Sequence, residues 1–90
     1  MNNKGSGWTW EEVKQQYPVG SIIEGTVVSV VPYGVWIDLG VGFPGLLLIP
    51  DAGLGRGQQT YGHFQPGDAI TTKVILFNDE RLTVRLFRQV

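Results

Sequence analysis

This chain of 90 residues contains no cysteine, which excludes disulfide bonds, thiolate metal sites and a cysteine nucleophile. Charged residues are also scarce, at 17% against roughly 25% in typical soluble domains. No apolar run approaches the roughly 20 residues of a membrane-spanning helix, and the polar start lacks the apolar core of a signal peptide. We therefore expect a soluble, cytoplasmic protein that folds by packing alone and has no membrane partner.

Basic residues do not predominate either. Seven Lys and Arg stand against eight Asp and Glu, so the formal net charge is −1. Because affinity for nucleic acid depends largely on neutralised phosphates, this balance argues against a strong binder of RNA or DNA. The net charge does not exclude a local basic face, since Arg81, Arg85 and Arg88 lie close together near the C-terminus.

Recognisable catalytic patterns are missing as well. His63 is the only histidine, and no carboxylate or nucleophile accompanies it in a readable motif. Asp38 and Asp68 are single carboxylates, and their spacing does not predict an acid–base pair or a cluster of metal ligands. We therefore expect no enzyme, with no catalytic residues, no metal and no cofactor.

Glycine and hydrophobic residues are plentiful. Thirteen glycines are about twice the average share, and 42% of the residues are hydrophobic, which together predict a turn-rich all-β fold. Residues 1–8 are expected to be flexible and residues 9–90 to form one domain. Thr9 and Glu12 fit a capping box that begins a short helix near Trp10 to Tyr17, and Pro18 ends it. Five strands are expected at residues 21–31, 35–39, 46–49, 69–77 and 82–87, with a long connection over residues 51–68.

The bend between the first two strands carries two aromatic rings. Burying Val35, Ile37 and Leu39 sends Trp36 outward, because side chains in a strand alternate between two faces. Trp36 and the nearby Tyr33 then have three possible roles. They could form a platform on which nucleic-acid bases stack, they could pack under the long connection or the helix, or they could belong to a protein-binding surface.

The pattern of these segments resembles the S1 RNA-binding domain from about Trp10 to the C-terminus, and most of all the internal repeats of ribosomal protein S1. The resemblance implies a five-stranded OB-fold barrel of S1 type, with Greek-key topology and a short N-terminal helix. The segments that carry it are Tyr17–Pro18–Val19–Gly20, Glu24–Gly25–Thr26–Val27, Tyr33–Gly34–Val35–Trp36–Ile37–Asp38–Leu39, Gly45–Leu46–Leu47–Leu48–Ile49, Pro66–Gly67–Asp68 and Lys73–Val74–Ile75.

The resemblance also implies a nucleic-acid face. Two aromatics flank the bend glycine, a third-strand position that is histidine in the family is leucine here, and an asparagine replaces the family's aspartate at the end of the fourth strand. An arginine follows the next turn, and a second arginine lies at the edge of the face. The RNA-binding residues that the resemblance implies are Tyr33, Trp36, Leu48, Asn78 and Arg81. Arg85 is added to them because basic residues beside a stacking face usually contact the phosphates.

The departures from the family pattern imply weak binding. Leu48 cannot hydrogen-bond a base or a phosphate, and Glu24 and Thr26 occupy positions where basic residues would help. The leading hypothesis is therefore weak, sequence-tolerant binding of single-stranded RNA by a monomer, with ribosomal or RNA-processing proteins as possible partners. The alternative is a protein-interaction adapter on an S1-like barrel that has lost most of its RNA affinity.

Overall fold

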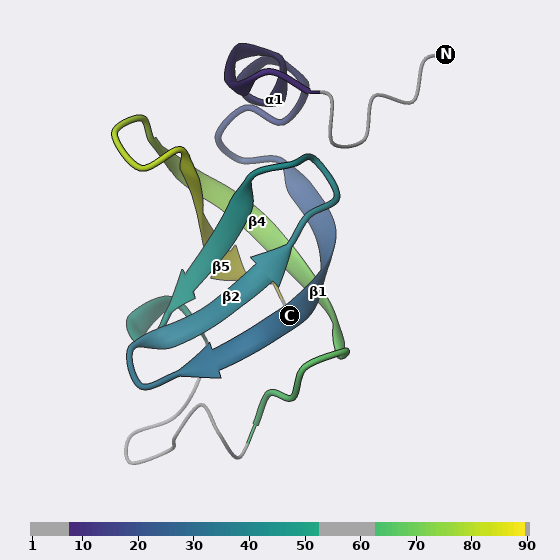
Figure 1. Ribbon diagram of the computed structural model, residues 1–90, viewed down its shortest axis with the longest axis vertical. Helices are drawn as coiled ribbons and strands as arrows, with labels where there is room; N and C mark the ends of the chain where they lie inside the picture. The colour runs from purple at the N-terminus through teal and green to yellow at the C-terminus, as the bar shows by residue number, and fades with distance from the viewer. Residues whose placement is uncertain (1–7, 53–62, 90) are drawn as a thin grey trace.

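The computed structural model describes residues 8–52 and 63–89. Within them, five strands close into a barrel in the order β1-β2-β3-β5-β4, with one helix at the N-terminal end (Figure 1). All neighbouring strands are antiparallel except β3 and β5, which run parallel. The all-β barrel with a short helix is therefore confirmed. The elements are α1 (Trp10–Gln16), β1 (Ile22–Val31), β2 (Gly34–Asp38), β3 (Pro44–Leu48), the 3-10 turn η2 (Ile49–Asp51), β4 (Ala69–Asn78) and β5 (Thr83–Arg88).

Helix α1 begins at the predicted capping box. The Thr9 hydroxyl accepts from the Glu12 backbone N–H at 3.1 Å, and the Glu12 carboxylate accepts from the Thr9 N–H at 2.9 Å. These two bonds satisfy backbone donors that the first turn leaves unpaired. Val13 is buried in the core, so the helix packs against the barrel through this side chain.

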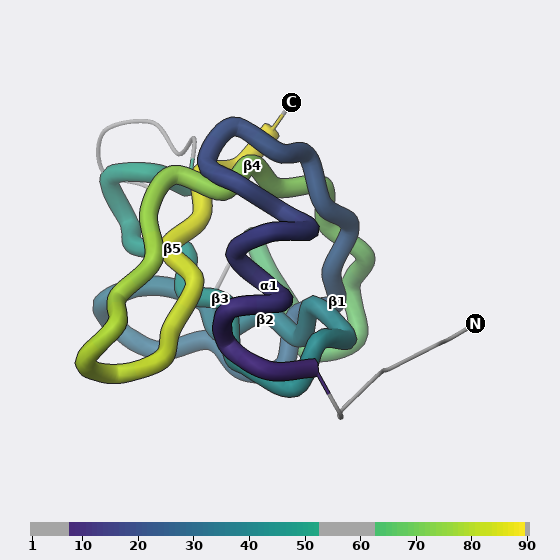
Figure 2. Tube along the Cα trace, turned by 90° about the horizontal axis from the view of Figure 1, so that it is seen from above, coloured from purple at the N-terminus to yellow at the C-terminus, as the bar shows by residue number. Residues whose placement is uncertain are grey.

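The same helix covers one end of the barrel, as the view from above shows (Figure 2). The Trp10 ring makes edge contacts with Phe43 at 5.1 Å and Phe77 at 5.5 Å between centroids. Trp8 packs beside Tyr17 at 6.1 Å, whereas residues 1–7, predicted to be flexible, lie outside the described residues. The aromatic residues of the N-terminal segment therefore serve packing at this end.

Inward-facing residues of the strands form the core together with residues of helix α1 and of the connections. Its buried hydrophobic members are Val13, Ile23, Val27, Val35, Ile37, Leu39, Val41, Leu47, Ala52, Phe64, Ile70, Val74, Val84 and Leu86. Gly25 of β1 packs closely against this core, and a β-carbon at its position would collide with the Ile37 side chain. The register of β1 with β2 shifts between Val27 and Ser29, which marks a bulge or irregularity in the strand pair.

The predicted bounds of two strands need correction. Strand β3 runs from Pro44 to Leu48 rather than over residues 46–49. Within it Leu47 is fully buried, and Leu46 and Leu48 are half-buried. Leu82, the first residue of the predicted strand 82–87, has a φ of 49° and is exposed in the turn, and β5 begins at Thr83. The connection between β4 and β5 covers residues 79–82, one residue later along the chain than predicted. In the ranges 8–52 and 63–89, no helix is long and apolar enough to cross a bilayer.

Candidate functional site

Three neighbouring strands carry a row of outward-facing side chains that includes Trp36. Trp36 of β2 is the register partner of Leu46 on β3, and Leu46 is in turn the partner of Arg85 on β5. Directly opposed residues on neighbouring strands project from the same face. Val35 and Ile37, on either side of Trp36, are buried. The half-buried indole is therefore on the outer face, as its alternation predicted.

The two aromatic rings at the bend are joined to each other. The Trp36 indole N–H donates to the Tyr33 hydroxyl at 3.2 Å, and Tyr33 is 52% exposed. Gly34 between them cannot be replaced without movement, because a β-carbon there would collide with the backbone carbonyl oxygen of Leu47. The bend thus approaches β3 closely and fixes both rings beside it.

A hollow of about 320 Å³ opens between these rings and the β4–β5 turn. It collects five of the six predicted site residues, and it adds two that the sequence did not single out. Leu48 is on the same face but lies two residues beyond Leu46 along β3, opposite Gly34, and does not line the hollow. The lining residues are Tyr33, Trp36, Leu46, Asn78, Arg81, Thr83 and Arg85.

The sequence analysis did not single out Leu46 or Thr83, and only the position of Leu46 follows from a sequence pattern. Leu46 precedes Leu48 by two positions, so strand alternation alone places both on one outer face. Thr83 carried no such signal, because its inclusion depends on where the turn before β5 ends. Its hydroxyl donates to the Arg81 carbonyl at 3.1 Å, which helps to hold the turn.

The arginines at the hollow differ in their surroundings. Arg81 is exposed, and its backbone N–H donates to the Asn78 side-chain oxygen at 3.1 Å, which closes the turn. Arg85 is partly buried and forms an ion pair with Asp51 of η2, with 3.1 Å between Nη2 and Oδ2. Its Nε is buried without a hydrogen-bond partner. The carboxylate that pairs with Arg85 therefore comes from another element of the fold.

Asp79 instead ties the β4–β5 turn to helix α1. Its Oδ1 accepts from the Trp10 indole N–H at 2.7 Å and from the Lys14 ammonium at 2.9 Å. The hydrogen bond from Trp10, followed by the one from Lys14, holds the pKa of the Asp79 carboxyl below its usual value. The hydrogen bond that Lys14 donates to Asp79 raises the pKa of Lys14 in return. The turn that carries Asn78 and Arg81 is thus braced from the helix side.

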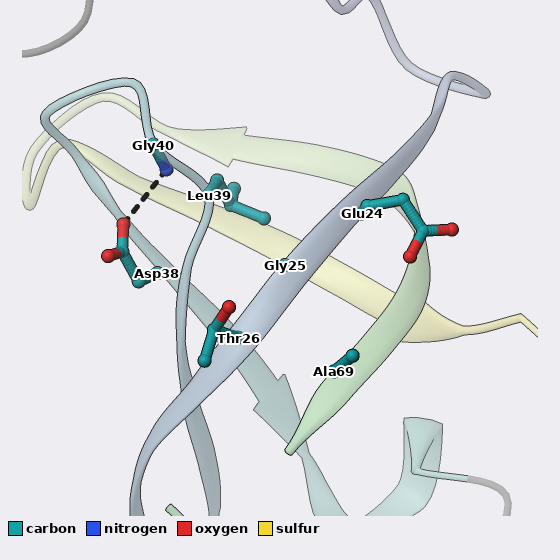
Figure 3. Close-up of a pocket in the computed structure, with 7 residues that line it drawn as sticks. All are labelled: Glu24, Gly25, Thr26, Asp38, Leu39, Gly40 and Ala69. Carbon is teal, nitrogen blue, oxygen red and sulfur yellow. Dashed lines mark hydrogen bonds between the residues drawn. The ribbon is translucent and has the colours of Figure 1, made fainter. Parts of the chain in front are cut away.

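A second hollow, of about 370 Å³, lies over β1 and the end of β2 (Figure 3). Its charged residues are the carboxylates of Glu24 and Asp38. Asp38 accepts from the Gly40 N–H at 2.9 Å, and Glu24 accepts from the Thr71 hydroxyl at 2.6 Å. These acids would repel phosphate, so the hollow beside Trp36 is the better candidate for an anionic polymer.

The potential metal ligands and the single histidine are described here for residues 8–52 and 63–89 alone. No group of three or more potential metal ligands is gathered among those residues. His63 is exposed, at the edge of a third hollow that also includes Asp68 and Arg88. Arg88 lies over the Phe64 ring at 5.1 Å, a packing contact at the barrel rim.

Known proteins resemble this chain over most of its length. It is 38% identical over 78 residues to polyribonucleotide nucleotidyltransferase of Thermus thermophilus, covering 87% of this chain and 11% of that protein. It is 30% identical over 78 residues to small ribosomal subunit protein bS1 of Pseudomonas aeruginosa, covering 86% of this chain and 14% of that protein. The chain therefore corresponds to a small part of these relatives.

Similar folds are also found among solved protein structures. The solution structure of GSP13 from Bacillus subtilis matches with a TM-score of 0.72 and 26% identity, covering 80% of this chain and 55% of that one. The family model for the S1 RNA binding domain matches residues 16–88. Barrel, topology and sequence agree, and the chain belongs to the S1 RNA-binding domain family.

Proposed function

We propose that this domain binds single-stranded RNA weakly and with little sequence preference at the hollow beside Trp36. The observation that carries the proposal is the pair of hydrogen-bonded rings, Tyr33 and Trp36, which lines one hollow together with Arg81 and Arg85. Membership of an RNA-binding family supports it. Every base has a π-face, so stacking on such rings tolerates any sequence and contributes about 1–3 kcal/mol per base.

The polar residues of the hollow have complementary roles in this proposal. Arg81, exposed at the tip of the turn, contacts a phosphate, and Asn78 holds that turn in place. Leu46 and Leu48 offer apolar contact to the bases on the β3 side. Binding is weak because Leu48 has no donor for RNA and because few cations surround the site, in a chain whose net charge is −1.

A titration of fluorescently labelled RNA tests the proposal. At low ionic strength, short single-stranded oligonucleotides of different sequence should give saturable binding with similar affinities, and duplex RNA should bind less well. Duplex bases are stacked on each other and cannot reach the rings. The absence of saturable binding by every single strand, up to millimolar RNA, would contradict the proposal.

A protein-interaction adapter is the second candidate. It is favoured by the exposed apolar side chains near the bend, Tyr33 at 52% and Ile49 at 38%, together with the net charge of −1. Aromatic residues are enriched at protein interfaces. If RNA failed to bind while Tyr33→Ala weakened co-purification with ribosomal or RNA-processing proteins, the adapter would be preferred.

Three further expectations belong to the proposal. The first is that the domain itself performs no catalysis, although one relative is a nucleotidyltransferase of which the chain spans 11%. The second is that it is a monomer, which size-exclusion chromatography with light scattering would test. The third is a cytoplasmic location, as for a protein that acts with ribosomes or RNA enzymes.

A further inference from the structure

Of the two arginines at the hollow, Arg85 is the partly buried one, and its guanidinium already has a carboxylate partner within the protein. Its Nη2 donates to Asp51 Oδ2 at 3.1 Å, and the two side chains are 26% and 23% exposed. Asp51 ends the short turn η2 that follows β3, whereas Arg85 lies in β5. A carboxylate is thus held beside the site where a phosphate would bind.

This ion pair is incomplete. A guanidinium can form two parallel hydrogen bonds to one carboxylate, and the two-bond arrangement is the stronger one. Arg85 instead makes a single bond, and its Nε–H is buried with no partner. An unpaired buried donor is unfavourable. The pairing therefore leaves Arg85 short of the hydrogen bonds that it can make.

Carboxylate and phosphate bind a guanidinium through the same donors and with the same fork geometry. Of the described residues that line the hollow, only Arg81 and Arg85 are basic. We propose that Asp51 competes with the RNA backbone for Arg85 and thereby sets the affinity of the site. This inference rests on the proposed RNA-binding function and identifies what limits it.

A purely structural role for the pair predicts something different. In that case Asp51 would only hold η2 against β5, and its replacement would lower stability without tightening RNA binding. Competition instead predicts tighter binding that depends on Arg85. The two readings are separated by affinity measured in a double-mutant cycle, because a cycle isolates the interaction between two side chains.

The experiment compares the wild type, Asp51→Asn, Arg85→Gln and the double variant, each titrated with the same labelled single-stranded RNA. Asp51→Asn should tighten binding about fivefold, the scale of one ion pair at a solvent-accessible position. The slope of log affinity against log salt should steepen by about 0.7, as for one added phosphate contact on a single strand. Arg85→Gln should remove this gain in the double variant.

A matched control separates competition from a general loss of negative charge. Glu80→Gln removes an exposed carboxylate beside Arg81 in the β4–β5 turn, and its effect should be smaller than that of Asp51→Asn and unchanged by Arg85→Gln. Urea unfolding verifies that each variant is folded. If Asp51→Asn does not fold, Asp51→Ser replaces it. Arg85→Gln alone remains a test in any case, because it should weaken wild-type binding less than Arg81→Gln does.

The outcomes distinguish this inference from the function on which it rests. Equal RNA affinity of the wild type and Asp51→Asn overturns the competition and leaves RNA binding intact. A greater loss with Arg85→Gln than with Arg81→Gln also overturns it, because Arg85 would then already contact RNA. Binding by Asp51→Asn alone supports it strongly. No binding by any variant overturns both proposals.

Discussion

Trp36 is the residue on which the proposed site most depends. Its indole N–H already donates to the Tyr33 hydroxyl, so the edge of the ring is satisfied within the protein. The face of the ring is then free to meet a base without a buried donor being lost. A ring that is fixed before binding also loses little conformational entropy when the base arrives.

Replacing Trp36 tests the stacking contact. Trp36→Ala should weaken RNA binding by about 1–3 kcal/mol, or roughly fivefold to 150-fold, whereas Trp36→Phe should keep most of the affinity because it keeps a stacking face. Fluorescence anisotropy with labelled RNA measures both. Phe87→Ala is the matched control, since Phe87 is an exposed aromatic on β5 outside the hollow. Equal losses for Trp36→Ala and Phe87→Ala would count against the site.

Two glycines test how tightly the bend and the first strand are packed. Gly34→Ala should destabilise the fold more than Gly25→Ala, because the new methyl meets a backbone oxygen of Leu47 in the first case and a movable side-chain carbon of Ile37 in the second. Overpacking of this kind typically costs about 1–3 kcal/mol. Urea unfolding of the two variants measures the difference, and a more stable Gly34→Ala would contradict the close approach of the bend to β3.

Residue patterns predicted the outer position of Trp36 but not the state of Arg85. Strand alternation is a local signal, and it was enough to place the indole and the buried Val35 and Ile37. The ion pair between Asp51 and Arg85 joins residues 34 positions apart. Which carboxylate meets an arginine across a barrel depends on strand register, so no local pattern in the sequence indicates this pair.

At the scale of elements, helix α1 and the β4–β5 turn act as one unit. The capping box and the inner packing of the helix were predictable because their residues are neighbours in sequence. The contact between Trp10 and Asp79 was not, because it joins residues 69 positions apart. Strand ends were also misplaced at Leu82, where a positive φ of 49° makes an apolar residue part of the turn.

The hydrogen bonds from Trp10 and Lys14 of α1 to Asp79 of the β4–β5 turn should make the stability of the fold depend on pH. The folded-state pKa of Asp79 lies below its usual value of 3.8. Its contribution is therefore fully present above that value and is lost as the pH falls through the folded pKa. Asp79→Asn has no such proton to bind. On acidification from neutral pH, the thermal midpoint of the wild type should fall more than that of Asp79→Asn, and parallel profiles would contradict this coupling.

At the scale of the whole molecule, the small charge limits how strongly RNA is held. The net charge is −1, and the hollow offers only Arg81 and Arg85 among its described lining residues. The barrel therefore supplies a shaped surface with few cations. Most of the binding free energy should come from stacking, which depends little on salt.

The salt dependence of RNA binding measures this balance. One or two phosphate contacts on a single strand give a slope of log affinity against log salt of about −0.7 to −1.4. With Arg85 engaged by Asp51, the wild type should lie near the shallow end. Anisotropy titrations over a series of salt concentrations provide the slope. A much steeper value would mean that the backbone is bound over a basic surface elsewhere on the chain.

The three tryptophans allow the central claim to be tested within one sample. Trp36 lies at the proposed site, whereas Trp10 is bonded to Asp79 and Trp8 packs on Tyr17 at the helix end of the barrel. In an NMR titration of nitrogen-15-labelled protein with single-stranded RNA, the indole N–H signal of Trp36 should shift progressively, while those of Trp8 and Trp10 stay in place. A shift confined to Trp8 and Trp10, or no shift of Trp36 at saturating RNA, would contradict binding at the bend.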